Sequence, residues 1–263
     1  MKVRVNGVEL FVESSGQGDV ALVFMHYYGG SSRTWLEVID GLKEQYRCYA
    51  YDHRGWGESD KSAVSYGITD LADDAEALIR ELGLTRYVLV GHSMGAKAAQ
   101  LLASRCPEGL EALVLVAPSP PTPQDMPPDF RQAMVHFYDT REGAEAAFNN
   151  IVRLPLKEHV REMVLEDMQK SCPPARAAWP ETAMIEDISA SVASIQAPTL
   201  ILAGEMDPVD RLEAVEREVA GRIPPARLEV LRNTGHLSPL EVPREIAERI
   251  TAFLSETVPG ASA

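Results

Sequence analysis

Tyr87-Val88-Leu89-Val90-Gly91-His92-Ser93-Met94-Gly95 is the stretch that decides the fold, and a helix-forming run over residues 96–103 follows it. The four apolar residues predict a buried strand. A serine on a sharp turn between a strand and a helix takes strained backbone angles, and the residues two before and two after it crowd each other. Glycine at positions 91 and 95 relieves that crowding. The pattern therefore predicts a nucleophilic Ser93 whose oxygen faces the first amides of the helix.

Similar apolar runs, each bounded by Gly, Pro or Asp, recur on both sides of this segment. They span Ala21–Met25, Cys48–Tyr51, Leu113–Val116, Thr199–Leu202 and, more weakly, Leu228–Leu231. Runs without polar alternation are typical of strands that are covered on both faces, as in a parallel sheet. At the N-terminus, two alternating runs flank Asn6-Gly7, which predicts a tight hairpin.

Helical periodicity fills the gaps between the strands. One helix places Leu71, Leu78 and Leu82 on a single face, with Thr69 as its expected cap, and another begins at Pro243. Strands that alternate with helices predict an α/β fold, with a mostly parallel sheet flanked by helices.

One long segment departs from this alternation. Ten of the eighteen prolines lie between Pro118 and Pro180, together with helix-like stretches over Phe130–Tyr138 and Glu158–Gln169 and without a strand signal. The sequence therefore predicts a core of residues 1–118 and 196–263, and an inserted helical cap of residues 119–195 over the carboxyl edge of the sheet. The alternative is a long insertion with local helices and no role in function.

Composition narrows the class of partner. The chain of 263 residues has 39 acidic and 25 basic side chains, a net charge of −14, which argues against nucleic acid and anionic membranes as partners. The three cysteines are widely spaced, which argues against a disulfide framework and a thiolate metal site and favours a reducing compartment. The first residues do not resemble a secretory signal, and no apolar stretch is long enough to span a membrane. We therefore expect a cytoplasmic protein; its oligomeric state is left open.

A serine hydroxyl is a weak nucleophile at neutral pH and needs a base and an orienting acid. His236 follows the last predicted strand, and Asp207 follows the strand Thr199–Leu202. The order Ser, Asp, His, with each residue at the carboxyl end of a strand, is the order that α/β-hydrolases use. Asp210, three residues beyond Asp207, is a rival for the role of the acid.

Together these motifs resemble a cap-bearing serine α/β-hydrolase of the carboxylesterase and cofactor-free haloperoxidase type, over nearly the whole chain. The segments that carry the resemblance are His26-Tyr27-Tyr28-Gly29-Gly30, Asp52-His53-Arg54-Gly55-Trp56-Gly57-Glu58-Ser59, Gly91–Gly95 and the pair Asp207 and His236. The resemblance implies the α/β-hydrolase fold with an inserted cap.

The resemblance also implies a role for each site residue. Ser93 attacks a carbonyl carbon, His236 takes and returns the proton, and Asp207 orients the imidazole. The backbone amides of Met94 and Tyr28 form the oxyanion hole. His26 is expected to brace its loop by hydrogen bonds, and Asp52 and Arg54 to brace their turn.

The loop departs from the family pattern at one position. Many relatives carry glycine directly after the loop histidine, where this chain has Tyr27. A side chain at this position is expected to shrink the acyl pocket or to change the loop.

An acyl-enzyme on Ser93 predicts a substrate with a carbonyl carbon, and a small neutral carboxylic ester is the first choice. Lactone hydrolysis, carbon–carbon bond hydrolysis and perhydrolysis use the same three residues, and a slow-turnover ligand receptor of the same architecture is the alternative outside catalysis. The expected substrate-binding residues are Tyr27, Tyr28, Phe137, Trp179 and Leu237. Phe130, Met134 and Tyr138 either join them in an apolar wall or pack the cap onto the sheet. The sequence predicts neither a metal site nor a cofactor.

Overall fold

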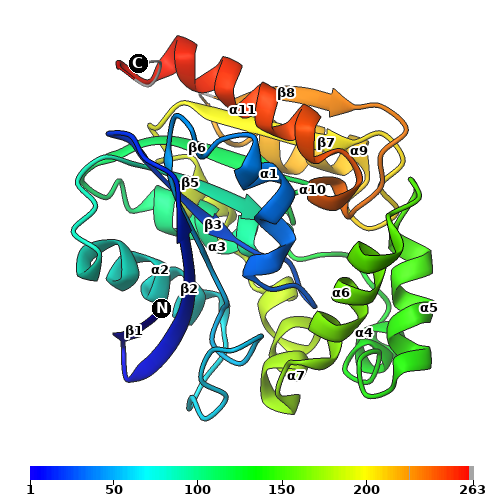
Figure 1. Cartoon of the computed structure of the whole chain (residues 1–263). Helices are drawn as coiled ribbons and strands as arrows, with labels where there is room; N and C mark the ends of the chain where they lie inside the picture. The colour runs from blue at the N-terminus through cyan, green and yellow to red at the C-terminus, as the bar shows by residue number, and fades with distance from the viewer. Residues whose placement is uncertain (225, 261–263) are drawn as a thin grey trace.

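The computed structural model describes residues 1–224 and 226–260, and a sheet of eight strands forms its centre (Figure 1). The strands are β1 (Lys2–Val5), β2 (Val8–Ser15), β3 (Ala21–Met25), β4 (Arg47–Tyr51), β5 (Tyr87–His92), β6 (Leu110–Val116), β7 (Thr199–Gly204) and β8 (Ala226–Leu231). Their order is β1-β2-β4-β3-β5-β6-β7-β8; β2 pairs antiparallel with β1 and β4, and the other neighbours are parallel. The predicted mostly parallel sheet is confirmed.

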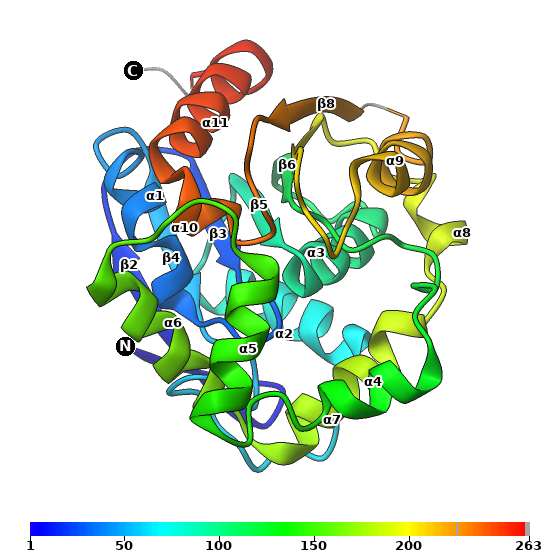
Figure 2. The ribbon, with the colours of Figure 1, turned by 90° about the vertical axis from the view of Figure 1, so that its right-hand side faces the viewer.

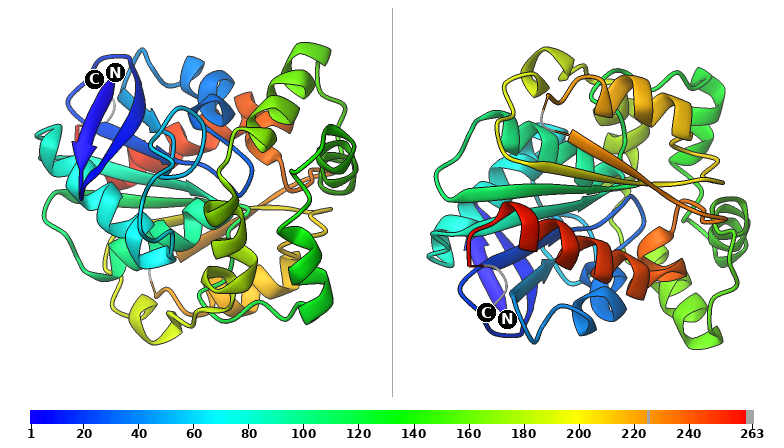
Figure 3. Two further views of the ribbon diagram at one scale, coloured as in Figure 1. Left: turned by 90° about the horizontal axis from the view of Figure 1, so that it is seen from below. Right: turned by 90° about the horizontal axis from the view of Figure 1, so that it is seen from above.

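Helices cover both faces of this sheet, as Figure 3 shows with the sheet between two helical layers. On one face lie α2 (Ile68–Glu81) and α3 (Met94–Ser104), and on the other lie α1 (Leu36–Asp40) and α11 (Pro243–Thr257). Successive side chains of a strand point to opposite faces. Tyr87 and Leu89 therefore join the first core, and Val88 and Val90 join the second. Burial on both faces is the reason why the strand is apolar throughout.

The remaining short elements connect these layers. They are the 3₁₀ turns η1 (Ser32–Trp35) and η2 (Ala183–Ile185), the α-helical turns α9 (Leu212–Ala214) and α10 (Ser238–Glu241), and η3 (Val215–Ala220), a π-helical turn. In the hairpin, Asn6 and Gly7 both have positive φ, as a tight turn requires.

The start of α2 corrects one expectation. Thr69 is already the second residue of the helix, and it does not cap it. Instead, Asp70 Oδ2 accepts a hydrogen bond of 2.8 Å from the amide of Gly67, just before the helix. A carboxylate in the first turn also interacts favourably with the helix dipole. The predicted start of α11 at Pro243 is confirmed.

A run of helices separates β6 from β7 and lies at one end of the sheet (Figures 1 and 2). These are α4 (Pro128–Met134), α5 (Arg141–Ile151), α6 (Glu158–Gln169), α7 (Pro173–Glu181) and α8 (Ser189–Val192). The predicted division into a core (residues 1–118 and 196–263) and a cap (residues 119–195) stays a prediction. Residues 225 and 261–263 of the predicted core lie outside the residues that the structure describes. Within that part, no helix has the length and apolar character needed to cross a bilayer.

Candidate active site

Ser93 lies on the turn between β5 and α3 and has left-handed backbone angles, φ 52° and ψ −113°. The two flanking glycines make this turn possible. A β-carbon at Gly91 would lie 2.6 Å from the Cα of Ala96, and one at Gly95 would lie 2.5 Å from the carbonyl oxygen of Met25. Both distances are shorter than side chains tolerate, so the elbow requires glycine at both positions.

The structure brings Ser93, His236 and Asp207 together. His236 Nε2 lies 3.0 Å from Ser93 Oγ, and His236 Nδ1 lies 2.8 Å from Asp207 Oδ2. With a proton on Nδ1 donated to the carboxylate, Nε2 accepts the hydrogen bond of the serine hydroxyl. The rival acid, Asp210, is further away, with its Oδ2 4.0 Å from His236 Nδ1.

Burial alone would lower the pKa of His236, but the neighbouring carboxylates of Asp207 and Asp210 raise it above its ordinary value. A positive charge on the imidazole of His236 is therefore stabilised by the two carboxylates. The Asp207 carboxylate, 2.8 Å from His236 Nδ1, thus orients the imidazole ring and also increases its basicity.

Three contacts hold the loop of His236, and sequence reasoning missed all of them. The amide of His236 donates to the carbonyl of Ile151 at the end of α5, at 2.9 Å. The carbonyl of His236 accepts a hydrogen bond of 2.8 Å from His92 Nε2. Glu241 Oε2 accepts hydrogen bonds of 2.9 Å from the amides of Gly235 and Leu154. Nothing in the sequence pattern distinguishes Glu241 from an ordinary helix-surface residue.

Neither of the two amides expected to form the oxyanion hole is used by a backbone hydrogen bond in the described residues, and Tyr28 lines the same cavity as Ser93. Met94 is the first residue of α3, so its N–H has no acceptor within the helix. In residues 1–224 and 226–260, the N–H of Tyr28 donates to no backbone carbonyl. The carbonyl of Tyr28 accepts a hydrogen bond of 3.2 Å from the hydroxyl of Tyr138, so the segment between β6 and β7 contacts the peptide that follows Tyr28.

His26 holds the loop after β3 in place by two hydrogen bonds. Its Nε2 accepts a hydrogen bond of 3.0 Å from the amide of His53, so Nδ1 carries the proton and donates to the carbonyl of Tyr27 at 2.7 Å. Burial lowers the pKa of His26 to about 4, which keeps the ring neutral. His26 therefore joins the loop to the turn after β4 and does not face the serine hydroxyl.

The turn after β4 is held by charged side chains that point away from the serine. Asp52 accepts hydrogen bonds from the amides of Ser32, at 2.6 Å, and Glu58, at 2.8 Å. Arg54 forms a paired contact with Asp74, with both N···O distances at 2.6 Å. Neither Asp52 nor Arg54 lines the cavity at Ser93.

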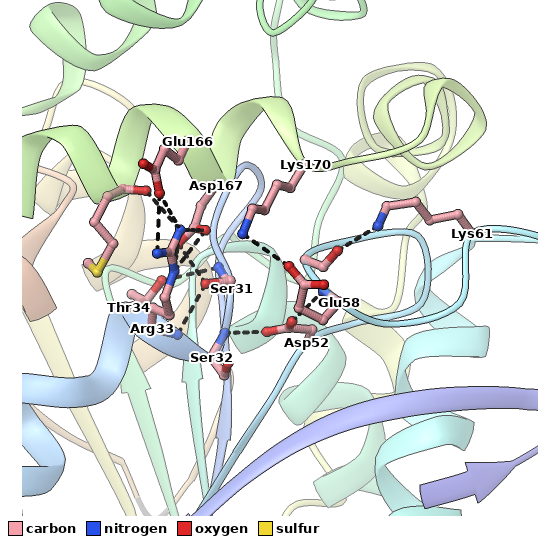
Figure 4. A network of polar contacts seen from close by, with 12 residues as sticks. Ser31, Ser32, Arg33, Thr34, Asp52, Glu58, Lys61, Glu166, Asp167 and Lys170 are labelled. Carbon is pink, nitrogen blue, oxygen red and sulfur yellow. Dashed lines mark hydrogen bonds and ion pairs between the residues drawn. The ribbon is translucent and has the colours of Figure 1, made fainter. Parts of the chain in front are cut away.

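A polar network, defined as Ser31, Arg33 and Asp167, connects the end of the loop after β3 to α6 (Figure 4). Asp167 is buried, with 3% of its surface exposed. Its Oδ2 accepts a hydrogen bond of 2.6 Å from the Ser31 hydroxyl, and the guanidinium of Arg33 pairs with the same carboxylate. Burial raises the pKa of Asp167 although Arg33 and Ser31 act in the opposite direction.

Ser93 and His236 open into a cavity of about 140 Å³. Its other lining residues come from the loop after β3, the segment between β6 and β7 and the loop after β7: Tyr27, Tyr28, Met126, Phe130, Met134, Phe137, Tyr138, Ala147, Asn150, Ile151, Trp179 and Val209. Four of the five expected substrate-binding residues, Tyr27, Tyr28, Phe137 and Trp179, are therefore at the cavity. The fifth, Leu237, is not; its side chain is fully buried in the hydrophobic core at the start of α10.

The chain belongs to the alpha/beta hydrolase family, which residues 22–249 match. The chain is similar to the carboxylesterase YbfK of Bacillus subtilis, with 27% identity over 92% of this chain and 82% of that protein. It is also similar to the non-heme chloroperoxidase CPO-A1 of Kitasatospora aureofaciens, with 28% identity over 88% of this chain and 90% of that protein. The structure of a thermophilic esterase from Thermogutta terrifontis is 25% identical and superimposes with a TM-score of 0.83, covering 98% of this chain and 99% of the esterase. The predicted family and fold are confirmed: this is an α/β-hydrolase.

Proposed function

We propose that this hydrolase cleaves small neutral carboxylic esters through an acyl-enzyme on Ser93. The observation that carries the proposal is the contact of Ser93 Oγ with His236 Nε2 at 3.0 Å, continued by His236 Nδ1 to Asp207 at 2.8 Å, in an apolar cavity. A hydroxyl, an imidazole and a carboxylate in this order perform nucleophilic acyl transfer.

In the first half of the reaction, the carbonyl oxygen of the ester lies between the amides of Met94 and Tyr28. Ser93 Oγ attacks the carbonyl carbon while its proton moves to His236 Nε2, and Asp207 stabilises the imidazolium. The two amides stabilise the tetrahedral oxyanion, and each such donor is worth about 3 kcal/mol of barrier. The C–O bond then breaks, and His236 returns the proton to the leaving alcohol.

The second half of the reaction repeats these steps with water. His236, neutral again, takes a proton from a water molecule as its oxygen attacks the acyl carbon. The second tetrahedral intermediate collapses, the proton passes to Ser93 Oγ, and the carboxylic acid leaves.

The cavity supports the choice of a small, neutral substrate. Apart from His236 and three tyrosines, its lining is made of residues without titratable side chains. Burial raises the pKa of Tyr27, Tyr28 and Tyr138, so all three are neutral at physiological pH. A charged acyl group would lose its hydration at this site without gaining a partner of opposite charge.

The test is hydrolysis of p-nitrophenyl acetate, butyrate and octanoate by the wild type, by Ser93→Ala and by the control Ser14→Ala, whose serine is exposed on β2. We expect repeated turnover, a preference for the short esters, and a loss of about 10³-fold or more in kcat for Ser93→Ala alone. Equal rates for Ser93→Ala and the wild type would contradict the proposal.

The same assay separates the alternatives. A single equivalent of p-nitrophenol without further turnover would favour the ligand receptor. Parallel assays with lactones of increasing ring size and with acetate plus hydrogen peroxide measure lactone hydrolysis and perhydrolysis; the resemblance to a non-heme chloroperoxidase favours including the second. An ester kcat/KM below that of a lactone or of perhydrolysis would replace our first choice.

A further inference from the structure

A second buried carboxyl group lies beside the three residues of the proposed mechanism. Only 2% of the side chain of Asp210 is exposed. Its Oδ2 is 4.0 Å from His236 Nδ1, the nitrogen that donates to Asp207. A modest rotation of the imidazole would therefore exchange one carboxylate for the other.

Two polar side chains from the loop after β6 hold the carboxyl group of Asp210 in place. Ser119, in the loop after β6, donates a hydrogen bond of 3.3 Å to Asp210 Oδ2, and its Oγ is 3.5 Å from Ser93 Oγ. Gln124 Nε2 donates to Asp210 Oδ1 at 2.7 Å. Because Ser119 gives its proton to Asp210 and Ser93 gives its proton to His236, the contact between the two hydroxyl groups is one of packing, and Asp210 acts on the site through its position beside His236.

A purely structural role does not account for this arrangement. The loop after β7 is closed by Asp207, whose Oδ1 accepts hydrogen bonds from the amides of Val209 and Asp210. The side chain of Asp210 contributes nothing to that closure. A buried carboxyl group is costly, and a neutral amide could make the same contacts with Ser119 and Gln124.

We propose that Asp210 is a positioning residue for the ester hydrolysis described above: it is a second acceptor for the Nδ1–H of His236. This inference rests on the proposed function for its reaction, although its geometry does not depend on the substrate. The surroundings agree with the assignment, because burial and the Asp207 carboxylate raise the pKa of Asp210 to about 7, against the opposing effect of His236.

The charged groups near Asp210 come from three elements. His236 faces it from the loop after β8, and Asp207 from its own loop. The positive charge of Lys97, on α3, interacts with the Asp210 carboxyl group at longer range. The Nζ of Lys97 itself donates a hydrogen bond of 2.7 Å to the carbonyl of Glu186. With Asp207 ionised, a second negative charge at Asp210 holds a proton on His236 more tightly.

The first test is the pH dependence of Ser93 phosphonylation by a fluorophosphonate, which requires the nucleophile and its base but no ester. In the wild type the rate rises with pH as His236 loses its proton. For Asp210→Asn we expect this limb to move to lower pH by about half a unit or more, because a negative charge near the imidazole is gone. Asp125→Asn, which removes an exposed carboxylate from the adjoining loop, is the matched control and should leave the limb in place.

The second test asks whether Asp210 supports His236 when Asp207 is absent. Labelling rates are measured for Asp207→Ala, Asp210→Asn and the double variant. We expect the loss of Asp210 to cost about tenfold or more in the Asp207→Ala background and only a fewfold in the wild type. Where Asp210→Asn does not fold, Asp210→Ser is used for both tests.

The assignment is overturned if the labelling rate of the Asp210 variants rises with pH at the same place as in the wild type. It is also overturned if the loss of Asp210 lowers the labelling rate by the same factor with and without Asp207. The outcome is separate from that of the proposed function. Labelled Ser93 without ester turnover would reject the esterase while leaving the role of Asp210 measurable, and ester turnover with an unmoved limb would do the reverse.

Discussion

The ring of Tyr27 lies against the backbone of Gly30, where a β-carbon would come within 2.6 Å of ring atoms Cδ1 and Cε1. The same ring lines the cavity at Ser93 and stands 4.9 Å from the imidazole of His92. The tyrosine that departs from the family pattern is therefore accommodated by a glycine three residues later.

Gly30→Ala should displace this ring toward the cavity and disturb the loop. We expect kcat/KM for p-nitrophenyl butyrate to fall by about tenfold or more, since oxyanion stabilisation depends on amide positions within a fraction of an ångström. Tyr27→Ala/Gly30→Ala should recover part of the loss, because the ring that collides with the methyl group is gone. A double variant no better than Gly30→Ala would contradict this account.

Gly95→Ala should damage the elbow through its backbone. The added methyl group would meet the carbonyl oxygens of Met25 and His26, at 2.5 and 2.6 Å, and neither backbone atom can move independently of β3. We expect the free energy of unfolding in urea to fall by about 2 kcal/mol or more, as for other overpacked sites. Ala252→Gly, at an exposed position of α11, is the control and is expected to cost only about 1 kcal/mol.

The raised pKa of Asp210 should be visible in stability. A carboxyl group whose pKa rises from 3.8 to about 7 on folding contributes stability below pH 3.8 that is lost as the pH rises through 7. Asp210→Asn has no such dependence. The difference in unfolding free energy between variant and wild type should therefore shift in favour of the variant by about 3 kcal/mol between pH 5 and pH 8.

Equilibrium urea titrations of both proteins across this pH range provide the measurement. A constant difference would show that Asp210 ionises in the folded protein as it does in the unfolded chain.

The network of Ser31, Arg33 and Asp167 should behave as a coupled unit (Figure 4). Arg33→Ala leaves the buried Asp167 carboxylate without its cation, and we expect a loss of about 2–3 kcal/mol in unfolding free energy. Because Asp167→Asn removes the charge that needs compensation, the double variant Arg33→Ala/Asp167→Asn should lose less than the sum of the single variants. Additive losses would show that the two groups do not stabilise each other.

Much of this site could be predicted because its signals are local. The elbow at Ser93 is encoded by nine consecutive residues. Its two glycines are required because a β-carbon would collide with Ala96 at Gly91 and with the end of β3 at Gly95. Asp207 and His236 could be found because each directly follows a strand of a parallel sheet, so both reach the same edge.

Other residues could not be predicted, since their roles depend on how distant segments pack. Ser119 and Gln124 meet Asp210 only because the loop after β6 passes over the end of β7, some 90 residues later along the chain. The predicted place of Leu237 at the cavity is wrong, because the chain turns into α10 there and the side chain is buried in the core. The cap of α2 was misassigned because Thr69 and Asp70 are both plausible first-turn residues, and the carboxylate of Asp70 makes the contact.

The hydrogen bond from the amide of His236 to the carbonyl of Ile151 has a consequence for selectivity. Ile151 ends α5, and Ile151 and Asn150 both line the cavity wall. An ester too bulky for the cavity would press on this wall and, with it, on the peptide that carries the imidazole. If the chain hydrolyses esters as proposed, we expect it to discriminate against large substrates twice, first by a weaker fit and then because the imidazole is drawn away from the Ser93 hydroxyl.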